Sequence, residues 1–191
     1  IRILSGGKWG SSKIIARTSS TVVTVSTFTD FNFGATTATD NWRLGIWSDT
    51  TGWPTTATFY QQRLFFANNS QSPNTVWASE SGNFETFSPT NNEAEVLDDS
   101  GLDLTLATDQ VNAIRWMYGA KQLQLGTSDG PFIMSSGSDN LALTPSNVTS
   151  NRETTDGTTT KKPIGASRAT IFIDRTRTKI RELAYNIEVD G

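Results

Sequence analysis

Histidine and cysteine are both absent from this chain of 191 residues. Their absence excludes disulfide bridges, thiol nucleophiles, Ser-His-Asp triads, Cys-His dyads and zinc sites within these residues. Any catalysis would have to depend on carboxylates. The sequence also lacks a Walker loop, a dinucleotide-binding fingerprint and a nucleophile elbow, which favours a protein that is not an enzyme. We therefore expect no catalytic, cofactor-binding or metal-binding residues.

Long apolar runs and an excess of basic residues are missing too. No apolar stretch approaches the roughly 18 residues that a membrane-spanning helix requires, so we expect no membrane span. The formal net charge is -3 at pH 7, which argues against a module that reads nucleic-acid sequence through a basic face. The chain begins at Ile1 and stops at Gly191 inside a strand-like pattern, which predicts a piece of a longer protein.

The sequence does contain many short strand-like runs, separated by Gly, Ser, Asn, Asp and Thr and almost without helical periodicity. This pattern predicts an all-β fold. Residues 13–17 and 21–28 form a predicted hairpin, and residues 30–40 a predicted loop into a strand over 42–46. Residues 59–67 have the composition of one strand.

Three predicted hairpins repeat along the rest of the chain. They pair residues 63–67 with 75–79, 121–125 with 131–135, and 169–173 with 179–185. Successive copies start about 50 residues apart, which is the length of a four-stranded propeller blade. The sequence therefore predicts a propeller-like array of antiparallel β-sheets, with about three blade-like repeats and an N-terminal β-hairpin segment. An irregular β-sandwich whose hairpins merely look alike is the alternative.

Two regions follow from this interpretation. We expect residues 1–48 to be the N-terminal β-hairpin segment, as part of an upstream domain. Residues 49–191 are then the propeller-like module, truncated at its C-terminal end. Residues 147–162 are almost wholly polar and are predicted to be a long mobile loop between two blades.

Four sequence blocks carry a resemblance to a known family. The longest, residues 53–87, contains the aromatic runs WPTTATFYQQRLFFA and SPNTVWASESGNFETF. The others are NWRLGIWS at 41–48, LDLTLATDQVNAI at 102–114 and RELAYNIEVDG at 181–191. Together and in this order they resemble the tail tubular protein B family, the nozzle subunits of short-tailed bacteriophages.

That resemblance implies a virion structural protein of the phage tail. Such a protein would be a homo-oligomer, a ring of six beneath the portal and the adaptor or gatekeeper ring, with tail fibres as further partners. Double-stranded DNA would pass through its channel without sequence-specific binding during genome ejection. A mildly acidic wall suits such a conduit because it does not grip phosphates, although an ordinary acidic domain has the same charge.

A carbohydrate-binding or glycan-cleaving β-domain acting on the host envelope is the alternative function, and an adhesin-like binding domain is another. The carbohydrate alternative would use Trp47 and Trp53, which we expect to be exposed, with an acidic cluster. That cluster consists of Glu93, Glu95, Asp98, Asp99 and Asp103. Calcium and glycosidase sites need carboxyls in a defined arrangement, and we interpret these five as a solvated loop before an inward-facing strand at 102–107.

Basic residues alternate along the third hairpin, at Arg175, Arg177, Lys179 and Arg181. Alternate residues of a regular strand share a face, so we predict that the four side chains form one surface. A subunit interface, a solvated strand edge and a DNA contact are the three interpretations of that surface. The aromatics of the repeats are interpreted as core, because each buries a large apolar area. These are Phe65, Trp77, Trp116 and Phe172.

Overall fold

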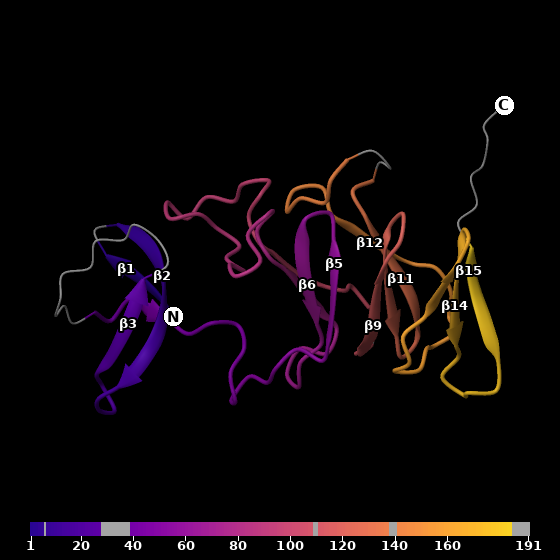
Figure 1. Ribbon diagram of the computed structural model, residues 1–191, viewed down its shortest axis with the longest axis horizontal. Coiled ribbons are helices and arrows are strands. Elements are labelled where there is room, and N and C mark those ends of the chain that lie inside the picture. Colours follow the sequence, from indigo (N-terminus) through magenta and orange to yellow (C-terminus); the bar gives the residue numbers. More distant parts are fainter. Residues whose placement is uncertain (6, 28–38, 109–110, 138–140, 185–191) are drawn as a thin grey trace.

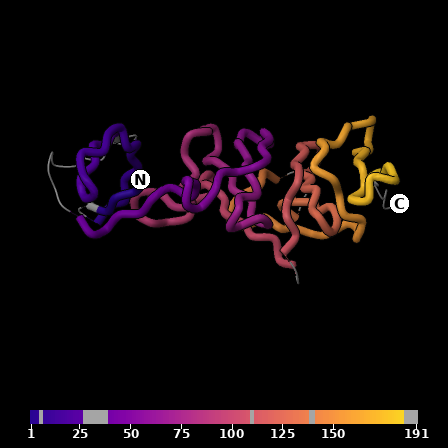
Figure 2. Tube along the Cα trace, turned by 90° about the horizontal axis from the view of Figure 1, so that it is seen from below, coloured from indigo at the N-terminus to yellow at the C-terminus, as the bar shows by residue number. Residues whose placement is uncertain are grey.

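The computed structural model of the chain describes residues 1–5, 7–27, 39–108, 111–137 and 141–184. Within them the strands form four small antiparallel sheets, which confirms the all-β prediction. The sheets follow one another along the longest axis of the molecule in the order of the sequence (Figures 1 and 2). This described part contains no helix long and apolar enough to cross a membrane.

Each sheet is built from strands that are close in the sequence. The N-terminal sheet has the order β3-β2-β1-β4, with β1 Arg2–Ser5, β2 Lys8–Arg17, β3 Val23–Thr27 and β4 Trp42–Arg43. The second sheet runs β5-β6-β7-β8, with β5 Thr56–Tyr60, β6 Arg63–Ala67, β7 Thr75–Ala78 and β8 Leu102–Thr105. The third runs β9-β10-β11-β12, with β9 Ile114–Gly119, β10 Leu123–Thr127, β11 Gly130–Ser135 and β12 Thr149–Arg152. The fourth runs β13-β14-β15, with β13 Ile164–Ala166, β14 Ala169–Ile173 and β15 Ile180–Ala184.

The N-terminal sheet contains the predicted hairpin, the predicted strand that begins at Trp42, and β1, which was not predicted. β2 pairs antiparallel with β3, and the first half of β2 pairs with β1. The strand predicted over 42–46 is wrong in its length, because pairing with β1 includes only Trp42 and Arg43. The predicted strand end at Phe28 and most of the loop predicted at 30–40 lie outside the described residues.

The other three sheets are meanders, in which each strand pairs with its neighbours in the sequence. The predicted hairpins are present as β6 with β7, β10 with β11, and β14 with β15. The first strand of each hairpin is the second strand of its sheet, so the three hairpins occupy equivalent positions. The described residues form no closed propeller.

Two local predictions are wrong. Residues 59–67 are not one strand, because a turn at Gln61 and Gln62 separates β5 from β6. Both glutamines have positive φ, 45° and 60°, a conformation that hairpin turns normally assign to Gly, Asn or Asp. The loop predicted at 147–162 contains β12, a polar edge strand that is held by its pairing with β11 and shows no apolar alternation.

Shared apolar cores join the second, third and fourth sheets. Phe65 of the second sheet and Leu123 of the third belong to one buried cluster. On the opposite face of the third sheet, Trp116 packs with Phe172 and Leu183 of the fourth. The third sheet is therefore covered on both faces, and every residue of β10 is buried. The predicted core aromatics are confirmed, with exposed fractions of 0% for Phe65, 2% for Trp77, 1% for Trp116 and 3% for Phe172.

Candidate functional site

The four basic residues of the third hairpin do not lie along a regular strand. β15 begins at Ile180, so Arg175, Arg177 and Lys179 belong to the turn that precedes it, and only Arg181 is in the strand. Arg177 has a positive φ of 61°. The prediction of one basic surface assumed that all four residues lie on a regular strand. They do not, so the alternation in the sequence does not place their side chains on one face.

Asp174 organises this turn. Its carboxylate accepts hydrogen bonds from the Thr176 hydroxyl at 2.7 Å and from the backbone N–H groups of Thr178 and Lys179 at 3.2 and 3.3 Å. These donors, the Thr176 hydroxyl first, hold the pKa of Asp174 below its ordinary value. The buried Asp174 therefore fixes the shape of the turn from the inside. The basic residues Arg175, Arg177 and Lys179 of the same turn are exposed to solvent.

A polar pocket lies between this turn and the loop around Asp156. Arg181 forms an ion pair with Asp156 at 2.8 Å, and Arg175 lies 3.7 Å from the carboxylate of Asp129. Both arginines therefore face acidic residues of their own chain. Arg177 and Lys179 are exposed, and among the described residues neither forms an ion pair, so these two are the members of the set available to an anionic partner.

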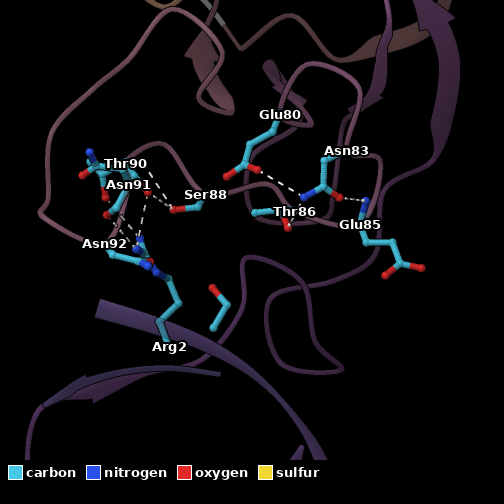
Figure 3. Close-up of a pocket in the computed structure, with 10 residues that line it drawn as sticks. Arg2, Glu80, Asn83, Glu85, Thr86, Ser88, Thr90, Asn91 and Asn92 are labelled. Carbon is cyan, nitrogen blue, oxygen red and sulfur yellow. Dashed lines mark hydrogen bonds between the residues drawn. The ribbon is translucent and has the colours of Figure 1, made fainter. Parts of the chain in front are cut away.

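A second polar pocket lies where the N-terminal sheet meets the loops that follow β7 (Figure 3). Arg2 reaches from β1 to the Thr90 hydroxyl at 3.2 Å and to the Asn91 carbonyl at 3.4 Å. Glu80 lies across the pocket, where its carboxylate accepts a hydrogen bond from Asn83 at 3.2 Å. Burial raises the pKa of Glu80, and the Asn83 hydrogen bond opposes that rise only in part.

Contacts beside this second pocket fasten the two sheets together. The Trp9 amide donates to the Asn92 carbonyl at 2.9 Å, and Lys8 pairs with Glu93 at 2.9 Å. Within the N-terminal sheet itself, the guanidinium of Arg2 lies 5.7 Å from the centroid of the Trp9 ring. Polar groups of this region thus hold the N-terminal sheet against the loop that follows β7. The residues that line the pocket are polar or charged, so the pocket has no apolar wall against which a ligand could pack.

The five acidic residues interpreted as a solvated loop are all exposed. Glu95 accepts a hydrogen bond from Asn91 at 3.3 Å, and Asp98 accepts one from Ser146 at 3.1 Å. Asp103 stands apart from the others in β8. The residue as a whole is exposed, but partial desolvation of its carboxylate raises its pKa, and a hydrogen bond from Trp77 acts in the opposite direction. Among the described residues, no three of the Asp and Glu side chains are grouped so that they could hold a metal ion.

The prediction for the two exposed tryptophans is half right. Trp53 is 60% exposed, and its indole N–H donates to Asp49 at 3.0 Å. Trp47 instead packs edge-on against Phe66, Trp77 and Phe87, with ring centroids 5.0, 5.7 and 4.8 Å away. Flanking turn residues made Trp47 look like a surface residue, whereas long-range packing decides its place.

Sequence reasoning gave no role to Arg63, which is 2% exposed. Its guanidinium donates to four backbone carbonyls: Ser79 at 2.8 Å, Ser100 at 2.6 Å, Asp98 at 2.7 Å and Asp99 at 3.3 Å. Desolvation lowers its pKa, which the acidic neighbours Asp99 and Glu80 counteract. One signal in the sequence could have shown this role: Arg63 is the only charged residue of an otherwise apolar strand, RLFFA. A charge buried with such a strand needs hydrogen-bond acceptors around it.

No known family model matches this chain, and no curated protein sequence matches it. The resemblance of the four sequence blocks to the phage nozzle proteins therefore remains a resemblance, and function has to be argued from the residues and their arrangement.

Proposed function

We propose that this chain is a structural module of a short-tailed phage tail, a subunit of the tail tube or nozzle whose ring forms a conduit for genome ejection. The observation that carries this proposal is where the family-like blocks lie. The blocks at 53–87 and 102–114 supply all the strands of the second sheet. The block at 41–48 supplies Trp47, which packs on the same sheet through Phe66 and Trp77. Blocks that are separate in the sequence thus build one unit, which favours a common module over chance matches.

We further infer that the second, third and fourth sheets are blades of a propeller-like array. Propeller blades are antiparallel meanders of four strands that pack face to face. The second and third sheets have that strand number and order. One shared apolar core joins the second sheet to the third, and another joins the third to the fourth. The fourth sheet has three strands in the described residues, so it supports the same arrangement with one strand fewer.

Electron microscopy of the purified full-length protein tests the conduit proposal. A ring with an axial channel is the expected result. A uniform population of single subunits across a wide concentration range would contradict the proposal, and so would compact oligomers without a channel.

The carbohydrate alternative receives less support from the geometry. Trp47 is engaged in an aromatic cluster, which leaves Trp53 alone of the two expected platform residues on the surface. Turnover of host envelope polysaccharides by the purified protein, abolished by Glu93→Gln, Glu95→Gln or Asp99→Asn, would nevertheless favour that alternative. General acid and base catalysis contributes about 10² to 10⁴-fold, so its loss would be easy to detect.

A further inference from the structure

The N-terminal sheet is joined to the rest of the chain without a shared apolar core. Both apolar clusters of the described residues draw only on side chains between Tyr60 and Leu183. These clusters pack the second, third and fourth sheets into one body, which we call the blade unit. The strands β1 to β4 lie beside this body at one end of the long axis (Figure 1). They are hydrogen-bonded to one another and form a body of their own, which we call the arm.

Polar contacts from the arm converge on one short segment of the blade unit. Arg2 of β1 donates to the Thr90 hydroxyl at 3.2 Å, and Lys8 of β2 forms an ion pair with Glu93 at 2.9 Å. Among the described residues, every hydrogen bond and ion pair that crosses from the arm to the blade unit ends on residues 90–93. We call these four residues the latch segment.

These crossing contacts are individually weak. The side chains of Lys8 and Glu93 are 64% and 51% exposed, and an exposed ion pair contributes little and is screened by salt. A polar pocket of about 240 Å³ occupies the same seam, so the two surfaces are not closely packed there (Figure 3). Bodies joined by a contact that is neither large nor apolar are expected to move relative to each other.

The chain that leaves the arm has a pivot between two fixed points. The strand β4 ends at Arg43, and Trp47 is anchored in the aromatic cluster of the second sheet. Between them, Leu44 and Gly45 are exposed and belong to no strand, and a Cβ atom at Gly45 would meet nothing within 4 Å. Hinges consist of a few such residues, which absorb changes in the backbone dihedral angles. Rotation at this point moves the arm and leaves the aromatic cluster intact.

We propose that the N-terminal sheet is a hinged arm, which the latch segment 90–93 holds against the blade unit and which swings about residues 44–45 when these contacts open. Opening breaks polar contacts and separates no apolar core of the described residues, so the closed and open arrangements lie close in free energy. High ionic strength favours the open arrangement, because it screens the ion pair of the latch. This inference goes beyond the proposed function, since the arm belongs to the single chain and needs no ring.

Single-molecule energy transfer measures the two arrangements directly. The chain contains no cysteine, so Thr24→Cys in the arm and Asn151→Cys in the third sheet each accept one dye. Both positions are exposed. Two distances are expected in the labelled wild type. The ratio of open to closed chains should rise between roughly 0.1 M and 1 M salt, where the screening length falls from about 10 to about 3 Å.

Charge changes in the latch test its role. Lys8→Glu places two carboxylates where the ion pair stood, so it should raise the ratio of open to closed chains at least about fivefold. Salt should then lower this ratio, because it screens a repulsion instead of an attraction. Adding Glu93→Lys restores opposite charges in reversed order and should return the ratio to the wild-type value. Lys13→Glu is the matched control, because Lys13 lies in the part of β2 that pairs with β3.

Hydrogen exchange at the Trp9 amide is a second readout, because this amide donates to the Asn92 carbonyl across the latch at 2.9 Å. Its exchange should accelerate in Lys8→Glu by the same factor as the open population. A single distance that neither salt nor Lys8→Glu changes would overturn the proposal. So would an equal shift in Lys13→Glu, or a charge swap that does not restore the ratio. Because dilute single chains are observed, none of these outcomes depends on whether the protein forms a conduit.

Discussion

Replacing Arg63 by methionine is expected to cost a large part of the stability of the second sheet. Arg63 is nearly inaccessible, and its guanidinium is a donor to the carbonyls of Ser79, Asp98 and Ser100 at 2.6 to 2.8 Å. Methionine fills the space of the arginine stem but offers no donor, so these carbonyls lose that partner. A buried polar group left without its partner costs about 1 to 3 kcal/mol, and removal of the desolvated charge offsets part of the sum. We expect a net loss of about 3 to 5 kcal/mol, against a total of about 5 to 15 kcal/mol for an ordinary domain.

Urea denaturation of the wild type, Arg63→Met and Arg63→Lys measures this loss. Lysine keeps the positive charge but lacks the planar guanidinium that reaches several carbonyls at once. The stability loss of Arg63→Lys should therefore be smaller than that of Arg63→Met. Arg17→Met is the control, because Arg17 is exposed and donates to the carbonyl of Ser19 within its own turn, and surface changes of this kind stay within about 0.5 kcal/mol. A loss below about 1 kcal/mol for Arg63→Met would refute the view that this arginine ties residues 98–100 to the sheet.

Three further changes probe other parts of the structure. Trp77→Ala, at a side chain 2% exposed within the aromatic cluster, should destabilise the fold by about 3 to 5 kcal/mol in the same assay, and a loss below about 1 kcal/mol would show that the residue is not core. Gly126→Ala should destabilise by about 1 to 3 kcal/mol, because a Cβ atom there would collide with the Trp116 ring, whereas Gly45→Ala, with open space around the new Cβ, should be tolerated. Because burial raises the pKa of Glu80 above its ordinary 4.5, the folded chain holds that proton more tightly than the unfolded chain, and stability falls as pH rises from 4.5 through the folded pKa. Glu80→Gln should therefore be more stable than the wild type at neutral pH in thermal melts, with a smaller decline above pH 4.5; equal pH profiles would contradict the sign, and Glu85→Gln in the same pocket is the control.

The hairpins could be predicted from the sequence because their information is local. β14 has the apolar run Ile171-Phe172-Ile173, and β10 and β11 are separated by Ser128 and Asp129, residues typical of turns. Each of these signals lies within a few residues of the element it specifies. Strand order then follows for a meander, because neighbours in the sequence are neighbours in the sheet.

The elements that were missed depend on distant partners. β12 has the polar sequence Thr-Ser-Asn-Arg and is a strand only because β11 offers it an open edge. Gln61 and Gln62 turn with positive φ because pairing of β5 with β6 fixes the register on both sides. Trp47 is drawn into the aromatic cluster by residues that are 19 to 40 positions further along the chain, Phe66, Trp77 and Phe87. No local pattern encodes such contacts.

The arrangement of the sheets also decides where this protein can contact other molecules. The third sheet uses both of its faces to pack on its neighbours, and the second sheet uses one face for the third sheet and one for the aromatic cluster. Within the described residues, contacts with partners are therefore left to the loops at the sheet ends, to the outer face of the fourth sheet and to the N-terminal sheet, where Ile15 and Trp42 are exposed. Arg181 is paired with Asp156, and Arg175 shares the carboxylate of Asp129 with Arg152, so the basic set predicted as an interface contributes chiefly Arg177 and Lys179. Both lie in the turn between β14 and β15, next in sequence to the exposed Ile173 and Ile180, so charge and apolar surface occur together there, a combination typical of protein interfaces.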